Sequence, residues 1–281
     1  MRAVFATDLS EASTAAISTQ ACLECLNRIG IDEVHLVTVI SSNVHYGMPG
    51  FDLDSQRRKA LENQRAFFEE EGFDVEMHVV RGTPHRRIND VAKRVGADMI
   101  VVGSKGQSPL ERRLIGSTAR NVARTSVRPL LIERIVEEDD GHEVAREHLF
   151  QRVLYATDFS ENADRAFDQF RVLKNATEEA TLVHVSDREQ QEAGISTEEA
   201  RERLESMADD LESYGIDTTI DVREDEPVEG ILAAEEEYDP TVILMGSRGQ
   251  SRLRRLLIGS VSESVTARAK SNVLIVPPTQ R

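Results

Sequence analysis

One stretch of the sequence occurs twice, and it constrains the fold more than any other feature. Residues 100–118 read IVVGSKGQSPLERRLIGST, and residues 243–261 read ILMGSRGQSRLRRLLIGSV. In each copy an apolar run ends in Gly, a second Gly follows after two residues, and Gly-Ser follows after nine more. The two copies lie 143 residues apart throughout. A repeat of about half the chain predicts duplication of a whole domain, rather than a solenoid of short repeats.

The chain length fits two domains of ordinary size. It has 281 residues, of which 40% are hydrophobic, which is enough for two cores. An acidic run, Glu-Glu-Asp-Asp-Gly, begins at Glu137 near the middle of the chain. We therefore predict a first domain over residues 1–136, an acidic linker over 137–150 and a second domain over 151–281.

The net charge restricts the partners of this protein. The chain carries 50 Asp and Glu against 34 Lys and Arg, a formal charge of −16. Such a surface argues against general binding to nucleic acids or to anionic membranes. The apolar runs are far shorter than the roughly 20 residues of a spanning helix, and the start of the chain lacks a signal-peptide layout. We expect a soluble, cytoplasmic protein.

Strand-like and helix-like segments alternate through both halves of the chain. In the first half the expected strands are residues 2–7, 33–40, 75–80, 98–102 and 129–135. In the second half they are residues 152–157, 181–186, 218–222, 242–245 and 272–276. This alternation predicts two tandem α/β domains, each a parallel sheet wrapped by helices. Ligands of such sheets bind beyond the carboxyl ends of the strands, where both glycine stretches lie.

The glycine stretches have the features of a phosphate-binding site. Gly permits positive φ and close backbone approach, and free N–H groups at a helix start hold anions. Residues 103–120 contain four basic residues and one acidic residue, and residues 246–261 contain four basic residues and none that is acidic. Two cationic segments in a strongly acidic chain fit an anionic ligand.

Structural interpretations compete with phosphate binding. The glycines could serve only a tight turn, with Ser117 as the N-cap of the next helix. The D-x-x-E sequences that begin at Asp8 and Asp158 resemble capping boxes, so these carboxylates could serve a helix, a ribose hydroxyl or both. The sequence contains neither a Walker A motif nor G-x-G-x-x-G, so standard P-loop and dinucleotide sites are not supported.

Cysteine and histidine usage points to no redox or metal chemistry. Cys22 and Cys25 form a C-x-x-C inside a helix predicted over residues 10–29, where a packing role is favoured over a redox pair. His142 and His148 lie in the linker without a further ligand set. We therefore expect no structural metal.

At these residues the chain resembles the universal stress protein family in its tandem two-domain form. The resemblance rests on Ala-Thr-Asp near the start of each half, on Gly-x-Pro at Gly82, and on the pattern G-x2-G-x9-G-[ST]. It covers nearly the whole chain. It implies doubly wound domains, each with a five-stranded parallel sheet of order 3-2-1-4-5. It also implies pairing of the domains through their fifth strands as an intramolecular pseudo-dimer, which a further homodimer could extend.

The resemblance also implies a ligand, because the branch of the family with this glycine pattern binds ATP. The partner would be an adenine nucleotide, with or without Mg²⁺. The residues that would meet adenosine or flank its base are Asp8, Val39, Asp158 and Val185. The residues that would hold phosphates are Gly103, Gly106, Gly116, Ser117 and Thr118 in the first half, and Gly246, Gly249, Gly259, Ser260 and Val261 in the second.

One departure separates the two halves. Gly82 of the first half corresponds to Asp225 of the second, and an acid near the phosphates would weaken the second site. The more basic glycine loop of the second half argues the other way.

Three functions remain open, and a nucleotide-binding stress sensor or adaptor is favoured. The alternatives are a slow ATPase or phosphotransferase, and a structural dimerisation module without nucleotide. Phosphoryl transfer requires metal-held phosphates and a positioned base or water. The Asp that follows the first strand has no accompanying His that is present in both halves. The first-half loop contains His45, Tyr46 and Asp52, but the corresponding loop of the second half, SDREQQEAG, has no equivalent His or Tyr. We therefore expect no catalytic residues.

Overall fold

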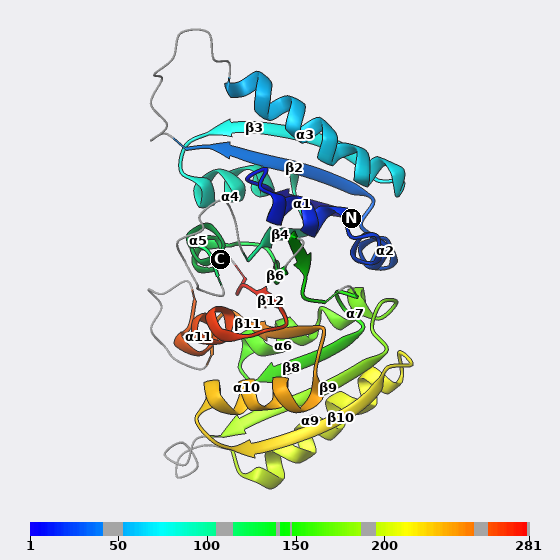
Figure 1. Cartoon of the computed structure of the whole chain (residues 1–281). Helices are drawn as coiled ribbons and strands as arrows, with labels where there is room; N and C mark the ends of the chain where they lie inside the picture. The colour runs from blue at the N-terminus through cyan, green and yellow to red at the C-terminus, as the bar shows by residue number, and fades with distance from the viewer. Residues whose placement is uncertain are drawn as a thin grey trace.

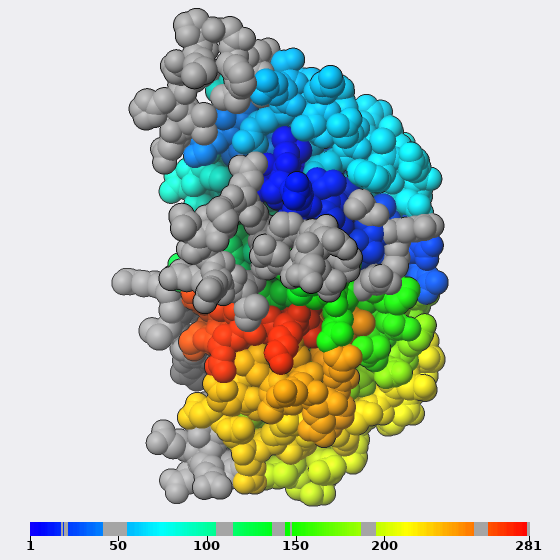
Figure 2. Space-filling model, in the orientation of Figure 1, coloured from blue at the N-terminus to red at the C-terminus, as the bar shows by residue number. Residues whose placement is uncertain are grey.

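The structure is a computed structural model that describes residues 1–41, 53–104, 115–138, 141–146, 148–186, 195–249 and 258–279. Ten of its strands form one continuous sheet to which each half of the chain contributes five (Figure 1). Blue to cyan segments of the first half lie at one end of the molecule, yellow segments of the second half lie at the other, and the red end of the chain lies between them (Figure 2). No helix within the described ranges is long and apolar enough to cross a membrane.

The first domain has the expected parallel sheet. Its strands are β1 (Arg2–Ala6), β2 (Glu33–Ile40), β3 (Asp74–Arg81), β4 (Met99–Gly103) and β5 (Leu130–Glu133). Its helices are α1 (Glu11–Ser18), α2 (Gln20–Arg28), α3 (Leu53–Glu70), α4 (Pro84–Val95) and α5 (Ser117–Thr125). The strand order is β3-β2-β1-β4-β5, with all neighbours parallel. The predicted order 3-2-1-4-5 is confirmed.

The second domain repeats this arrangement. Its strands are β8 (Arg152–Thr157), β9 (Glu179–Ser186), β10 (Asp217–Glu224), β11 (Val242–Gly246) and β12 (Asn272–Val276). Its helices are α6 (Glu161–Phe167), α7 (Phe170–Leu173), α9 (Thr197–Glu212), α10 (Pro227–Tyr238) and α11 (Ser260–Arg268). The order β10-β9-β8-β11-β12 matches that of the first domain.

Helices cover both faces of the sheet, because the strands are apolar on both sides. Along β2, Leu36 packs into the core shared by α1, α2 and α3, whereas Val37 packs into the core shared by α4 and α5. This alternation follows from the two-residue period of a strand. Each of the two cores contains residues of both domains, so buried apolar packing continues across the domain junction.

The domains join through their fifth strands. β5 and β12 are antiparallel, with Leu131 opposite Leu274. Just beyond β5 the buried Arg134 side chain donates to the carbonyl oxygens of Ser271 and Thr266. Burial lowers the pKa of this guanidinium to about 10, which leaves it charged at neutral pH. The fifth-strand pairing that the sequence implied is therefore present within one chain.

Two local features differ from the sequence-based expectation. The predicted helix over residues 10–29 is broken at Thr19, which is extended (φ −81°, ψ 106°) and donates its hydroxyl to the Ala15 carbonyl. A hydroxyl bonded to the preceding turn competes with helical backbone bonding. The predicted fifth strand is also shorter, and it is followed by a hairpin of β6 (Ile135–Glu138) and β7 (Gly141–Val144).

Both cysteines lie in α2, where they are buried and unbridged. Burial raises the pKa of the Cys25 thiol, which is the opposite of the shift that activates a redox thiol. The packing role favoured from the sequence agrees with this environment.

Candidate functional site

The turn after the first strand of each domain carries the predicted aspartates. Asp8 Oδ1 accepts a hydrogen bond from the Ser10 N–H (3.0 Å), and Asp158 Oδ1 accepts one from the Ser160 N–H (3.1 Å). The N-caps are the two serines, whose hydroxyls accept from the backbone N–H three residues on. The interpretation of Asp8 and Asp158 as cap residues is therefore wrong. Each carboxylate instead stabilises the turn before the helix through its hydrogen bond with the serine N–H.

This turn is conformationally strained in the same way in both domains. Leu9 (φ 64°) and Phe159 (φ 56°) occupy the left-handed region, which non-glycine residues rarely adopt. Their N–H groups donate to the hydroxyls of Thr7 and Thr157, at 3.0 Å in each case. Such strain persists only where surrounding contacts fix it, and it concentrates at functional sites.

A cavity of about 330 Å³ lies at the carboxyl ends of β8, β9 and β11 in the second domain. This volume falls within the range of small-molecule sites. The lining includes every residue of the second half that the sequence singled out: Asp158, Val185, Gly246, Gly249, Gly259, Ser260 and Val261. Four separate segments of the chain therefore bring the predicted residues to one place.

The two flanks of the cavity differ in chemistry. The flank formed by β9, α10 and the segment before α9 is apolar, with Val185, Ile195 and Ile231 in the lining. The flank formed by the turn after β11 and the start of α11 contributes Arg248 and glycine backbone. Asp158 follows β8, which lies between β9 and β11 in the sheet. Across the cavity, the apolar wall therefore lies on one side, the Asp158 carboxylate lies in the middle, and Arg248 and the glycine backbone lie on the other side.

Two glycines of the second glycine stretch lie where the backbone closely approaches its neighbours. A Cβ on Gly246 would lie 2.9 Å from the Asn162 carbonyl oxygen, and one on Gly249 would lie 2.5 Å from Asp158 Oδ2. Among the described motif glycines none has a positive φ, so that part of the expectation is wrong. A side chain at Gly246 would collide with the Asn162 backbone, and one at Gly249 would have to displace the Asp158 carboxylate.

The helices after the glycine loops begin without a side-chain cap. Gly116 and Gly259 are the N-caps, which corrects the assignment of Ser117 to that position. Each glycine N–H donates back to a carbonyl, that of Ser104 (2.7 Å) and that of Ser247 (2.6 Å) respectively. The N–H groups of the first turn of α11 are therefore not used by a cap side chain, and such groups suit an anion.

Asn162 is a site residue that sequence reasoning missed. Its Nδ2 donates to the Val276 carbonyl (3.0 Å), and its Oδ1 accepts from the Arg248 N–H (2.9 Å). The amide thereby ties the glycine loop to the end of β12. The corresponding residue of the first domain is Ala12, so only an alignment of the two turns would have drawn attention to this position.

We expect Asn162→Ala to lower the free energy of unfolding by about 1–3 kcal/mol, because it removes both hydrogen bonds of the buried amide and takes away the acceptor of the part-buried Arg248 N–H. Urea denaturation of the full chain measures this loss. Asn175→Ala, at an exposed position whose amide makes one 3.5 Å contact, serves as the matched control and should cost much less. Equal losses in the two variants would contradict the role assigned to Asn162.

His184 also lines the cavity and was not singled out from the sequence. The ring is buried against Phe159, with centroids 4.6 Å apart, and its Nδ1 lies 2.9 Å from the Thr157 carbonyl oxygen, to which it donates. Burial lowers the pKa of His184, although the Thr157 bond and the Asp158 charge act in the opposite direction. The imidazole is therefore neutral at pH 7. The first domain has Thr38 at the corresponding place on β2.

The first domain places its predicted residues at equivalent strand ends. Asp8 follows β1, Val39 lies at the end of β2 and Gly103 ends β4, while Gly116, Ser117 and Thr118 open α5. Gly106 lies outside the described residues, as do His45, Tyr46, Asp52 and most of the basic residues of both glycine loops.

Asp225 of the second domain is not among the residues that line the second-domain cavity, so its carboxylate makes no direct contact with that cavity.

Comparison with known proteins gives consistent matches. The model of the universal stress protein family matches residues 1–134 and again residues 149–277. Universal stress protein MJ0577 of Methanocaldococcus jannaschii is 29% identical over 154 residues, which cover 46% of this chain and 95% of that protein.

One solved structure extends the likeness over nearly the whole chain. The crystal structure of a universal stress protein from Archaeoglobus fulgidus is 26% identical, covers 98% of this chain and 97% of its own, and has a TM-score of 0.72. A universal stress protein solved in complex with cAMP is 27% identical, covers 48% of this chain and 96% of its own, and has a TM-score of 0.37.

Proposed function

The chain belongs to the universal stress protein family in a tandem two-domain form, and we propose that it binds ATP and acts in the stress response as a sensor or adaptor. The observation that carries this proposal is the second-domain cavity, which collects all seven residues expected of a nucleotide site in that half.

The order of chemical groups along the cavity fits an adenine nucleotide. The apolar wall at Val185 and Ile231 suits the faces of a purine ring. The Asp158 carboxylate, in the middle, would accept hydrogen bonds from ribose hydroxyls. The glycine backbone, the first turn of α11 and Arg248 would hold the phosphates, because backbone N–H groups and a guanidinium both favour anions. Mg²⁺ would enter with the phosphates rather than as a resident ion.

The same cavity gives little support for an enzyme. Asp158 is its only acidic residue among those described, so phosphate-bound metal would have one protein carboxylate at most. His184 is the one imidazole in the described lining; its Nδ1 donates to the Thr157 carbonyl, so only Nε2 could accept a proton, and the ring is buried against Phe159. Phosphoryl transfer requires both a metal clamp and a positioned base or water. Binding without turnover is the function we infer.

Calorimetry with ATP and Mg²⁺ tests the proposal. We expect the wild-type chain to bind, and Gly249→Val to lose binding in the second domain, because the new side chain would occupy the space beside Asp158 Oδ2. Gly116→Val places a side chain at the N-cap of α5 in the first domain and shows whether that half also binds. Circular dichroism verifies that each variant is folded.

Three results would overturn parts of this proposal. Absence of heat from the wild-type chain at high protein concentration would exclude ATP binding. Unchanged binding in both glycine variants would exclude these sites. Phosphate release that exceeds a blank and disappears in His184→Ala would replace the binder with an ATPase.

A further inference from the structure

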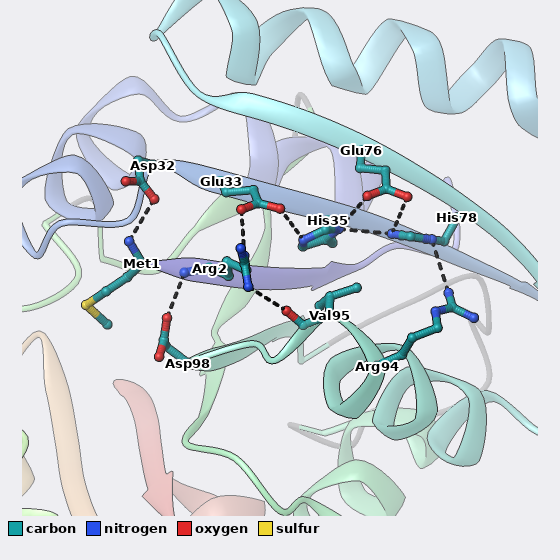
Figure 3. Close-up of polar contacts among 10 residues, drawn as sticks. All are labelled: Met1, Arg2, Asp32, Glu33, His35, Glu76, His78, Arg94, Val95 and Asp98. Carbon is teal, nitrogen blue, oxygen red and sulfur yellow. Dashed lines mark hydrogen bonds and ion pairs between the residues drawn. The ribbon is translucent and has the colours of Figure 1, made fainter.

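Two histidines and a glutamate converge on the α4 side of the first-domain sheet (Figure 3). His35 lies on β2 directly opposite Glu76 of β3, and His78 follows two residues further along β3. All three side chains share one face of the sheet, since residues two apart on a strand point the same way. His35 and Glu76 are the third residues of their strands and His78 is the fifth of β3, whereas the proposed nucleotide site lies at the carboxyl ends of the strands.

The facing atoms are spaced as metal ligands are. His35 Nδ1 lies 3.0 Å from His78 Nε2 and 3.5 Å from Glu76 Oε2, and His78 Nε2 lies 3.8 Å from Glu76 Oε1. A tetrahedral zinc ion with bonds of about 2.1 Å has ligand atoms about 3.4 Å apart. We propose that His35 Nδ1, His78 Nε2 and the Glu76 carboxylate bind a divalent transition-metal ion, with zinc as the best fit and water as the fourth ligand.

The surroundings of His35 support this assignment. Its other ring nitrogen, Nε2, lies 3.0 Å from Glu33 Oε1, although the angle is not that of a hydrogen bond. Glu33 is itself held by the Arg2 guanidinium at 2.6 Å. A carboxylate beside the non-ligating nitrogen is the usual means by which metal-binding histidines are oriented. His35 is 2% exposed and Glu76 is 64% exposed, so the ion would enter from the Glu76 side.

The Arg94 side chain of α4 contacts His78 and has to move before His78 can bind the ion. Its Nη2 lies 3.3 Å from His78 Nδ1, and a guanidinium only donates, so Nδ1 carries no proton. The neutral ring then holds its proton on Nε2, which donates to His35 Nδ1. Metal at Nε2 requires this proton to move to Nδ1, with no net gain or loss, and requires Arg94 to turn away. Arg94 is exposed and is free to do so.

The second domain lacks this set of ligands. At the corresponding positions it has Thr181, opposite Thr219, and then Asp221. Asp221 pairs with Arg223 at 2.5 Å instead. The proposed metal site therefore belongs to one half of the duplicated fold, and its occupancy would stabilise β2 and β3 without a counterpart on β9 and β10.

Zinc titration of the full chain tests the site. The protein must carry no polyhistidine tag and must first be dialysed against chelator. We expect calorimetry to show one Zn²⁺ per chain, and we expect Co²⁺ to give the visible absorption of a four-coordinate ion. Glu76→Gln, an isosteric change of an exposed side chain, should weaken zinc binding by about tenfold or more. His78→Ala should remove it, whereas His148→Ala, at an exposed position, should not change it.

The zinc affinity of Arg94→Gln distinguishes a metal site from a histidine pair that has only a structural role. The amide oxygen of Gln accepts the His78 Nδ1–H that metal binding creates, so we expect zinc to bind several-fold more tightly. Unchanged affinity in Arg94→Gln would overturn the role given to Arg94. Failure of the wild-type chain to bind Zn²⁺ would overturn the site, as would binding that persists in both Glu76→Gln and His78→Ala. Neither outcome affects ATP binding, which is measured separately.

Discussion

Leu274→Ala is expected to lower the free energy of unfolding by about 2–5 kcal/mol, the cost of a cavity in a packed core. Leu274 is fully buried on β12, opposite the fully buried Leu131 of β5. Both belong to a core that includes residues of each domain. The loss should therefore appear as one cooperative transition in urea denaturation, rather than as early unfolding of the second domain alone.

A double-mutant cycle identifies this effect with the junction. Leu131 and Leu274 are direct neighbours, so the losses of unfolding free energy in Leu131→Ala and Leu274→Ala should depart from additivity by about 0.5–3 kcal/mol. Leu204 is also fully buried, but it belongs to α9, which packs mainly against β10, the edge strand of the second domain (Figure 1). Leu131→Ala and Leu204→Ala should add. If the Leu131 and Leu274 effects were additive as well, the continuous core would not be the means of coupling.

Glu133→Gln is expected to stabilise the protein by about 4 kcal/mol at pH 8 and by very little near pH 4. Glu133 ends β5 and is buried, and burial raises the pKa of its carboxyl from 4.5 to about 8. Between these values the unfolded chain releases the proton while the folded chain keeps it, so the stability of the wild-type protein falls as pH rises. Each pH unit costs about 1.4 kcal/mol, and Gln does not incur this cost.

Chemical denaturation at several pH values between 4 and 9 measures this difference. Glu229→Gln serves as the control of opposite sign, because the Arg268 side chain lowers the pKa of the exposed Glu229 carboxyl. That variant should lose a little stability at neutral pH. Parallel pH profiles for the wild-type protein and Glu133→Gln would show that the Glu133 carboxyl is not buried in its neutral form.

The grouping of the predicted residues around the second-domain cavity was predictable because these residues lie at fixed places in a regular fold. Parallel strands end at one edge of the sheet, so Asp158, Val185 and the glycine loop are brought together by strand order alone. The contributions of Asn162 and His184 were not predictable in this way. Each lies outside the repeated motif, and each acts through atoms that approach only when the helix and the sheet pack.

The details of the turns were also not predictable from residue type. Asp, Ser and Gly all serve as N-caps, so the sequence around Asp8 and Gly116 allowed more than one assignment. The left-handed conformations of Leu9 and Phe159 decide which atom reaches the helix start. That choice depends on how the turn is held against the sheet, which no local preference encodes.

The sequence by itself determined the duplication, the α/β class and the edge of the sheet where a ligand would bind, because these depend on periodicity and on the spacing of glycines. Only the tertiary structure decided which side chains face one another across neighbouring strands. His35 and His78 lie 43 residues apart, and their meeting depends on strand register. Register is set by packing of the whole sheet between its helices, so the facing of these two rings appears only in the folded chain.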